Sequence, residues 1–161
     1  MVLANSISLT KTPAYLGIDP GKSGGAGLLN FNGGIIGVFK FKDLTMRDMF
    51  DNVFEWRRAY KIEAALEKVH SMPGQGVAST FKFGQNFGQL EMMLTAVKTP
   101  FDYVTPQKWQ KAMQCLTKGD KNVSKARAQQ IWPEQKMTHA IADALLIAEY
   151  CRRTSLNVTG T

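Results

Sequence analysis

Three acidic residues are placed where a folded chain could use a carboxylate for chemistry. Asp19 ends the short apolar run 15–18, Glu67 ends a second apolar run at 62–66, and Asp143 lies early in an apolar C-terminal segment. Carboxylate oxygens are the ligands that hard cations such as Mg²⁺ prefer. Together the three could form a metal site, although each alone is equally explained as a surface or helix-capping residue.

The turn that follows Asp19 is rich in glycine, from Pro20-Gly21 to Gly24-Gly25. A strand that ends in a lone acid before such a reversal places the acid at the edge of a sheet. Glycines there let the backbone or a ligand come close, because they carry no Cβ. The alternative is a hairpin turn that holds a solvated Asp19.

The hydrophobic pattern predicts the elements that position these acids. Residues 15–18, 26–31 and 35–41 are expected as antiparallel strands, the last two joined by the hairpin signal Asn32-Gly33-Gly34. The remaining pattern predicts strands at 62–66 and 101–104. It predicts helices at 44–60, at 77–97, from Pro106, at 121–131 and at 138–153. Asp120 or Asn122 is expected to cap the fourth of these helices, and Thr138 the last. The order βββ-α-β-α-β-α-α-α predicts an α/β protein with a mixed sheet flanked by helices. The acids converge if the last helix packs beside the strands that end in Asp19 and Glu67.

Length and composition indicate one globular domain. The 161 residues are 44% hydrophobic and 20% charged, and no apolar run approaches the roughly 18 residues that cross a bilayer. We expect tails at 1–13 and 155–161 around a domain at 14–154. The first dozen residues carry one charge, Lys11, and do not resemble a secretory or transit signal. Cys115 and Cys151 form no CxxC motif, so a reducing compartment is the default.

Positive charge is concentrated in one segment. The chain carries a net charge of +7, and residues 107–136 hold seven Lys and Arg against two acids, a local excess of +5. Clustered basic charge favours a polyanionic partner, most often a nucleic acid, with simple solubility as the alternative. No basic amphipathic helix stands out, which argues against a membrane partner.

Six short motifs, in this order along the chain, resemble the RuvC-type Holliday-junction resolvases of the RNase H-like superfamily, and most closely their small phage and organellar branch. They are Leu16-Gly-Ile-Asp-Pro-Gly21, Leu66-Glu-Lys-Val69, Val104-Thr-Pro-Gln-Lys-Trp109, Lys118-Gly-Asp-Lys121, Ser124-Lys-Ala-Arg-Ala128 and Ala142-Asp-Ala-Leu-Leu-Ile-Ala148. The resemblance implies a five-stranded RNase H-like core, a homodimer, and Mg²⁺- or Mn²⁺-dependent paired nicking of four-way DNA junctions. It also implies two metal ions, which Asp19 would bridge while Glu67 and Asp143 complete the coordination.

The last helix departs from the family pattern. Ala140 stands where the family usually has another acid, three residues before Asp143, so this chain is either an engineered inactive variant or a naturally diverged protein. His139 could assist as a ligand or proton carrier, or it is a capping or core histidine. Lys121, with Lys108 or Lys111, resembles family lysines near the scissile phosphate, or it lies on a solvated helix face.

The remaining DNA contacts are expected from the basic segment and from the loop after Glu67. Phe81, Phe83 and Phe87 are expected in helix packing or a dimer interface rather than in base stacking. The predicted DNA-binding residues are His70, Met72, Lys108, Lys111, Lys118, Lys121, Lys125 and Arg127. Phosphate contacts should dominate affinity.

Two other functions stay open. One is a nuclease of the same superfamily that cuts other branched DNA or RNA–DNA hybrids, and the other is a non-catalytic junction-binding protein, which Ala140 keeps possible. The expected location is the cytoplasm of a bacterium or a phage-infected host, or an organelle matrix if the source is eukaryotic.

Overall fold

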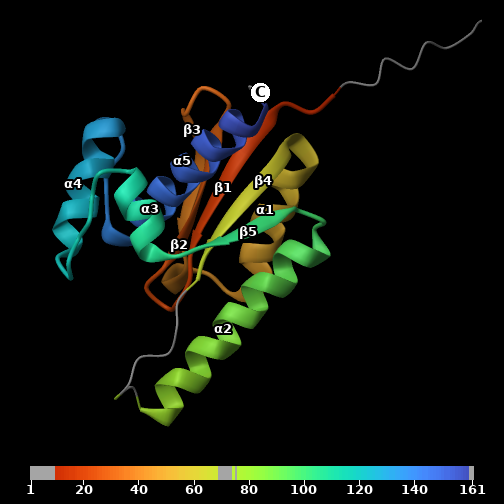
Figure 1. Cartoon of the computed structure of the whole chain (residues 1–161). Coiled ribbons are helices and arrows are strands. Elements are labelled where there is room, and N and C mark those ends of the chain that lie inside the picture. Colours follow the sequence, from red (N-terminus) through yellow and green to blue (C-terminus); the bar gives the residue numbers. More distant parts are fainter. Residues whose placement is uncertain (1–9, 69–73, 75, 160–161) are drawn as a thin grey trace, which may run out of the picture.

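The computed structural model describes residues 10–68, 74 and 76–159, so the predicted contacts of His70 and Met72 lie outside the described residues. A mixed five-stranded sheet forms the centre of the molecule, with helices on both faces (Figure 1). The strands are β1 (Pro13–Asp19), β2 (Gly25–Asn30), β3 (Ile35–Lys40), β4 (Lys61–Glu67) and β5 (Phe101–Val104), in the order β3-β2-β1-β4-β5. The predicted α/β class and five-stranded mixed sheet are confirmed.

Strand pairing brings two of the acids to one edge of the sheet. Strand β1 is antiparallel to β2 and parallel to β4, with Ile18 opposite Leu66. Asp19 and Glu67 are the next residues of the two strands. Because parallel strands end at the same edge, both carboxylates emerge there side by side.

The predicted hairpin between β2 and β3 is confirmed. The Asn30 side chain accepts hydrogen bonds from the backbone N–H groups of Asn32 and Gly34, each at 2.9 Å. Gly33 has a φ of +86°, which glycine adopts without a Cβ clash. This turn therefore has the local chemistry that the Asn-Gly-Gly sequence predicts.

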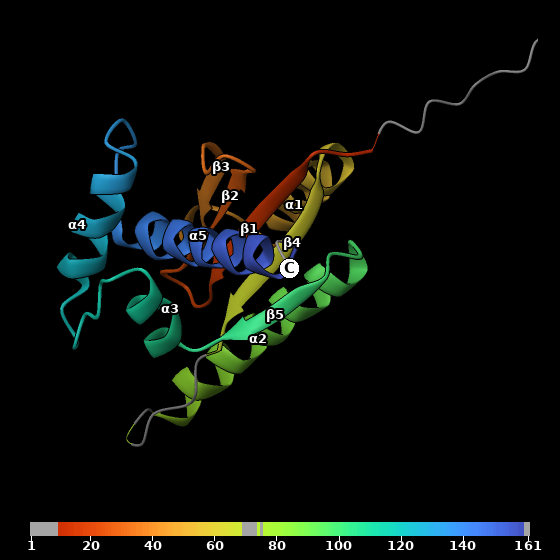
Figure 2. The same cartoon turned by 45° about the horizontal axis from the view of Figure 1, so that its top comes forward.

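The helices form two layers. Helix α5 (His139–Thr159) lies on one face of the sheet, and α1 (Met46–Ala59) and α2 (Val77–Ala96) lie on the other (Figure 1). Helices α3 (Pro106–Ala112) and α4 (Lys121–Ile131) lie beside the N-terminal end of α5 (Figure 2). A short 3₁₀ turn, η1 (Phe41–Asp43), follows β3. Separate apolar cores fill the two interfaces, one around Leu145 and Trp109 and the other around Leu16 and Leu90.

Helix α5 lies directly on β1 because Gly17 has no side chain. A Cβ at Gly17 would stand 2.1 Å from the carbonyl oxygen of Ala144 and 2.2 Å from the backbone nitrogen of Ala148. Gly27 of β2 likewise lies close to the Leu145 side chain. The backbone contact at Gly17 sets the position of Asp143, which precedes Ala144 in α5, relative to the end of β1.

The helix boundaries mostly agree with the sequence analysis. Helix α4 begins and ends as predicted, and the Asp120 side chain caps it by accepting from the Asn122 N–H at 2.9 Å. The last helix is longer than expected, since it continues past residue 153 to Thr159, and the tail expected from residue 155 therefore starts inside it. Ser155 explains the extension in part, because its hydroxyl donates to Glu63 Oε2 at 2.6 Å and ties this turn to β4. Among the described helices, none has both the length and the apolar character that a bilayer crossing requires.

Candidate active site

Asp19 and Glu67 form the centre of the candidate site. Their carboxyl groups lie close enough for each to shift the pKa of the other. Burial raises the pKa of Asp19 well above its usual value, and the negative charges of Glu67 and Asp143 raise it further. Carboxylates this close together disfavour each other's ionised form unless a counter-charge is present.

Asp143 joins the pair from α5. Burial raises its pKa, while the Ser124 hydroxyl and the neighbouring Lys121 and His139 side chains lower it. Its Oδ1 atom is buried and has no hydrogen-bond partner among the described residues. A buried acceptor without a partner carries a desolvation penalty of about 1–3 kcal/mol, so this oxygen is left ready for a ligand.

Glu67 is held by a tryptophan. The indole nitrogen of Trp109, in α3, donates to Glu67 Oε1 at 2.7 Å, and the two side chains are 1% and 8% exposed. Burial raises the pKa of Glu67, while the Trp109 hydrogen bond lowers it. Trp109 and Ser124 belong to two of the sequence motifs, but neither was expected to have a role of its own. One property of tryptophan could have indicated this contact: its indole N–H donates a hydrogen bond and cannot accept one, so a buried tryptophan requires an acceptor nearby.

Lys121 supplies positive charge to all three acids. It is the first residue of α4, its side chain is exposed, and its charge lowers the pKa of Asp19, Glu67 and Asp143. Ser124, one turn later, has its hydroxyl within reach of both the Lys121 carbonyl at 3.2 Å and the Asp143 carboxyl. One hydroxyl proton serves one acceptor at a time, so these two contacts compete.

Ala140 and His139 lie in the first turn of α5. His139 is exposed, and its side chain lies near enough to Asp143 to lower the pKa of that carboxyl. Ala140 is half-buried, and its backbone oxygen would stand 3.2 Å from a Cβ at Gly25. Its methyl group offers no ligand atom, so the site contains three acids and not four.

The predicted DNA-binding lysines and arginine differ in their surroundings. Lys108, Lys111 and Lys118 are exposed, as is Lys121, whereas Lys125 and Arg127 are half-buried. The Arg127 guanidinium donates to the Met113 carbonyl at 3.0 Å, so part of its hydrogen-bonding capacity holds α4 against the end of α3. The structure thus brings Lys121 to the acids and assigns Arg127 a contact within the fold.

The donor set suits a hard divalent cation. Three carboxylates offer only oxygen, one of their oxygens lacks a partner, and a cation would relieve the repulsion that raises the pKa of Asp19. In the described part of the chain, no group of three or more His, Cys, Asp or Glu side chains is already arranged as a metal site. The residues therefore fit such an ion by their chemistry.

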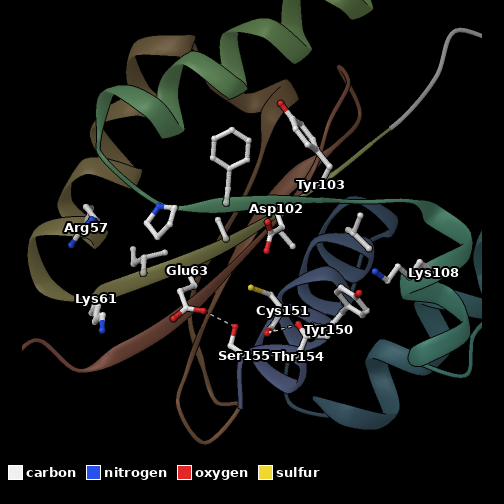
Figure 3. A pocket seen from close by; sticks show the side chains of 16 residues that line it. Arg57, Lys61, Glu63, Asp102, Tyr103, Lys108, Tyr150, Cys151, Thr154 and Ser155 are labelled. Carbon is white, nitrogen blue, oxygen red and sulfur yellow. Dashed lines mark hydrogen bonds between the residues drawn. The ribbon is translucent and has the colours of Figure 1, made fainter. Parts of the chain in front are cut away.

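A cavity of about 670 Å³ lies elsewhere, between the β4–β5 edge of the sheet and the C-terminal half of α5 (Figure 3). Its two carboxylates, Glu63 and Asp102, are exposed, and Glu63 accepts the hydrogen bond from Ser155. Lys108 also lines this cavity, whereas Asp19, Glu67 and Asp143 do not. The candidate acids thus lie outside this cavity.

Comparison with known proteins bears on the fold. No family model matches the chain, and no curated protein matches it in sequence. Two solved structures are similar to it at 18% identity, each over 92% of this chain and 97% of the other: Thermus thermophilus RuvC in complex with a Holliday junction substrate, with a TM-score of 0.65, and T. thermophilus RuvC, with a TM-score of 0.59. The chain therefore has a RuvC-like fold, with the five-stranded mixed sheet and flanking helices of the RNase H-like type.

Proposed function

We propose that this protein is a metal-dependent endonuclease of the small phage and organellar branch of the RuvC-type resolvases, and that it nicks four-way DNA junctions symmetrically as a homodimer. The observation that carries the proposal is the meeting of three carboxylates from β1, β4 and α5, each with a raised pKa, beside Lys121. The likeness to a RuvC solved with a Holliday junction supports the substrate class. The bacterial cytoplasm, or an organelle matrix in a eukaryote, is the corresponding location.

Asp19, Glu67 and Asp143 would hold Mg²⁺ or Mn²⁺. When bound, such ions would activate water and stabilise the leaving oxygen of a phosphodiester. The protein's own part is to gather three negative groups whose repulsion an ion relieves, and to offer the unpartnered Oδ1 of Asp143. Lys121 would attract and orient the scissile phosphate, and His139, which is exposed, would assist as a ligand or proton carrier.

The dimer and the DNA surface extend the same proposal. Helix α2 exposes large apolar side chains, with Val77 at 88%, Phe81 at 66% and Met92 at 63% exposure, and this favours a second copy of the chain as its partner. Phosphates would contact the basic segment, and His70 or Met72, in the loop after Glu67, would serve as the side chain that wedges into the junction. The residues proposed for DNA contact are His70, Met72, Lys108, Lys111, Lys118, Lys121, Lys125 and Arg127.

Ala140 makes the proposal testable. We expect the chain as it stands to bind junctions yet cut them slowly, because one ion would lack a charged ligand. Ala140→Asp should raise single-turnover junction cleavage by at least about 100-fold, since even supporting groups around a metal contribute 10–100-fold, and should change junction affinity by less than about tenfold. Gel assays at saturating enzyme with Mg²⁺ measure both, and Ala140→Asn is the uncharged control.

The same assay separates the other candidate functions. Fast cleavage by the unaltered chain, unchanged by Ala140→Asp, would show that three acids suffice. Flaps and RNA–DNA hybrids cut as fast as four-way junctions would favour the broader nuclease. A chain that cuts nothing in either form is a junction-binding protein if it prefers junctions to linear duplex without metal, and a general DNA binder if it does not.

A further inference from the structure

The contact between Trp109 and Glu67 joins two elements that are 42 residues apart in sequence. Strand β5 ends at Val104, whose carbonyl accepts from the Lys68 N–H at 2.8 Å, and α3 begins immediately afterwards at Pro106. The first turn of α3 therefore starts beside the end of β4. Trp109, the fourth residue of α3, reaches Glu67 from there.

The Trp109 ring is fixed by its surroundings. It belongs to the core cluster on the α5 side of the sheet, together with Met113, Cys115, Ile141 and Leu145. A close-packed side chain of this size does not change rotamer without displacing its neighbours. The indole N–H is therefore held in one place, and its only acceptor in the described structure is Glu67 Oε1.

Trp132 makes a useful comparison. Its indole N–H donates to the backbone carbonyl of Gly33 at 2.9 Å, and the residue is 8% exposed. Both tryptophans thus use a buried indole to close a long-range hydrogen bond. Trp132 holds a hairpin turn, whereas Trp109 holds a carboxylate that belongs to the candidate site.

We propose that Trp109 is a positioning residue, whose indole fixes the plane of the Glu67 carboxylate and commits Oε1, so that the other oxygen is presented to a divalent cation. This inference rests on the proposed function. An indole N–H donates without accepting and carries no charge, so it orients the carboxylate without competing for the cation. Groups that orient ligands in this way typically contribute 10–100-fold to metal affinity.

The first experiment compares Trp109→Phe with Trp132→Phe. Each variant removes one buried indole N–H and keeps an aromatic ring. Calorimetric titration with Mn²⁺ and Mg²⁺ should show affinity about 10–100-fold weaker in Trp109→Phe and changed by less than about threefold in Trp132→Phe. Thermal unfolding of both metal-free variants controls for a general loss of stability, which would affect both alike.

The second experiment needs no variant of Trp109. The chain has three tryptophans, so the indole N–H signal of Trp109 in a nitrogen–proton NMR spectrum is identified by elimination with Trp56→Phe and Trp132→Phe. Addition of Mg²⁺ should shift the Trp109 signal, because its acceptor becomes a metal ligand, and should leave the Trp132 signal unchanged.

The outcomes separate this inference from the function it rests on. The positioning role is wrong if folded Trp109→Phe binds the metal as tightly as the parent protein does. It is also wrong if the Trp109 indole signal does not shift when Mg²⁺ binds. Either result leaves the proposed metal site intact. If neither the parent nor its Ala140→Asp form binds Mn²⁺ or Mg²⁺, the proposed function is wrong and the positioning role is wrong with it.

Discussion

Strand β4 carries two glutamates with opposite surroundings. Glu67, at its end, is buried, contacts Asp19 and accepts from the Trp109 indole. Glu63, four residues earlier, is exposed in the cavity of Figure 3 and accepts from the Ser155 hydroxyl. The cavity region keeps its carboxylates in water, whereas the site region buries like charges against one another.

This difference identifies the region that bears chemistry. A surface cavity has little effect on the free energy of folding, and the cavity of about 670 Å³ lies away from the three acids. Gathering Asp19, Glu67 and Asp143 opposes folding, because desolvation and mutual repulsion both disfavour the charged form of Asp19. Such an arrangement is typical of functional sites, since a bound cation or substrate compensates for it.

The largest expected effect is the loss of metal binding at the acidic site. Asp19→Asn should weaken Mn²⁺ binding by more than about 100-fold, because it removes the charge at the centre of the carboxylate group. Asp102→Asn, in the cavity, should change it by less than about threefold. Calorimetric titration measures both. Equal losses in the two variants would mean that overall charge, and not the site, binds the metal.

The glycine under α5 should show the next largest effect. Gly17→Ala would place a methyl group 2.1 Å from the Ala144 carbonyl, so we expect it to lower the free energy of unfolding by at least about 3 kcal/mol. Gly84→Ala, at an exposed position of α2, would place a methyl group with no atom of the described residues within 4 Å. It should raise the free energy of unfolding by about 1 kcal/mol, the usual gain from replacing a helical glycine. Urea denaturation at pH 7 compares the two. If Gly17→Ala left the free energy of unfolding unchanged, α5 would be able to move away from β1 at little energetic cost.

The pH dependence of stability should have opposite signs for Asp19 and Glu149. Burial, followed by the charges of Glu67 and Asp143, raises the pKa of Asp19 in the folded state. The contribution of Asp19 is therefore present below its unfolded pKa of about 3.8 and is lost as the pH rises through its folded pKa. In metal-free protein, Asp19→Asn should raise the free energy of unfolding at pH 7 and leave it unchanged at pH 3. The gain at pH 7 is about 1.4 kcal/mol for each pH unit by which the folded pKa of Asp19 exceeds its unfolded pKa.

Glu149 is the contrasting case. Burial raises its pKa, but hydrogen bonds from Arg152 and Arg153, at 2.7–2.8 Å, outweigh burial and bring the pKa below 4.5. Its contribution is present above pH 4.5 and is lost as the pH falls through the folded pKa. Glu149→Gln should therefore lower stability at pH 7 and matter less at pH 3. Thermal unfolding at both pH values checks the two acids, and parallel behaviour would contradict this assignment.

The smallest expected effect separates two lysines. Lys121→Ala and Lys108→Ala should each reduce the slope of log affinity against log salt by about 0.9, if each lysine neutralises one phosphate. Only Lys121→Ala should also slow junction cleavage by the Ala140→Asp chain, because only Lys121 acts on the three acids. Binding measured at several salt concentrations, with single-turnover cleavage, tests both statements. If Lys108→Ala slowed cleavage as much as Lys121→Ala, the catalytic site would include residues nearer the cavity that Lys108 lines.

Much of the fold was predictable because its signals are local. The Asn-Gly-Gly turn, the alternation of apolar runs and the Asp120 cap each depend on a few neighbouring residues. The positions of Asp19 and Glu67 followed from those strands, since each acid simply ends one. Asp143 was a candidate from its place early in the last helix, but its role as a metal ligand came from the family resemblance, because nothing in its spacing reveals that α5 packs over β1.

The contacts that define the site were not predictable. The Trp109–Glu67 hydrogen bond depends on where α3 starts after β5, and the free oxygen of Asp143 depends on how α5 lies on Gly17. Arg127 was expected on the DNA surface, yet its hydrogen bond to Met113 depends on the packing of α4 against α3. The extension of α5 to Thr159 likewise rests on a contact with β4, far away in sequence.

The close approach at Gly17 has a consequence for protein engineering. A designer who transplanted Asp19, Glu67 and Asp143 into another sheet would carry over the ligands without the spacing between them. That spacing is set by the missing side chain two residues before Asp19 and by the alanine that follows Asp143, since the two backbones touch there. The smallest transferable unit is therefore the strand, its glycine and the helix lying on it, and graded enlargement of Gly17 would tune the separation of the acids.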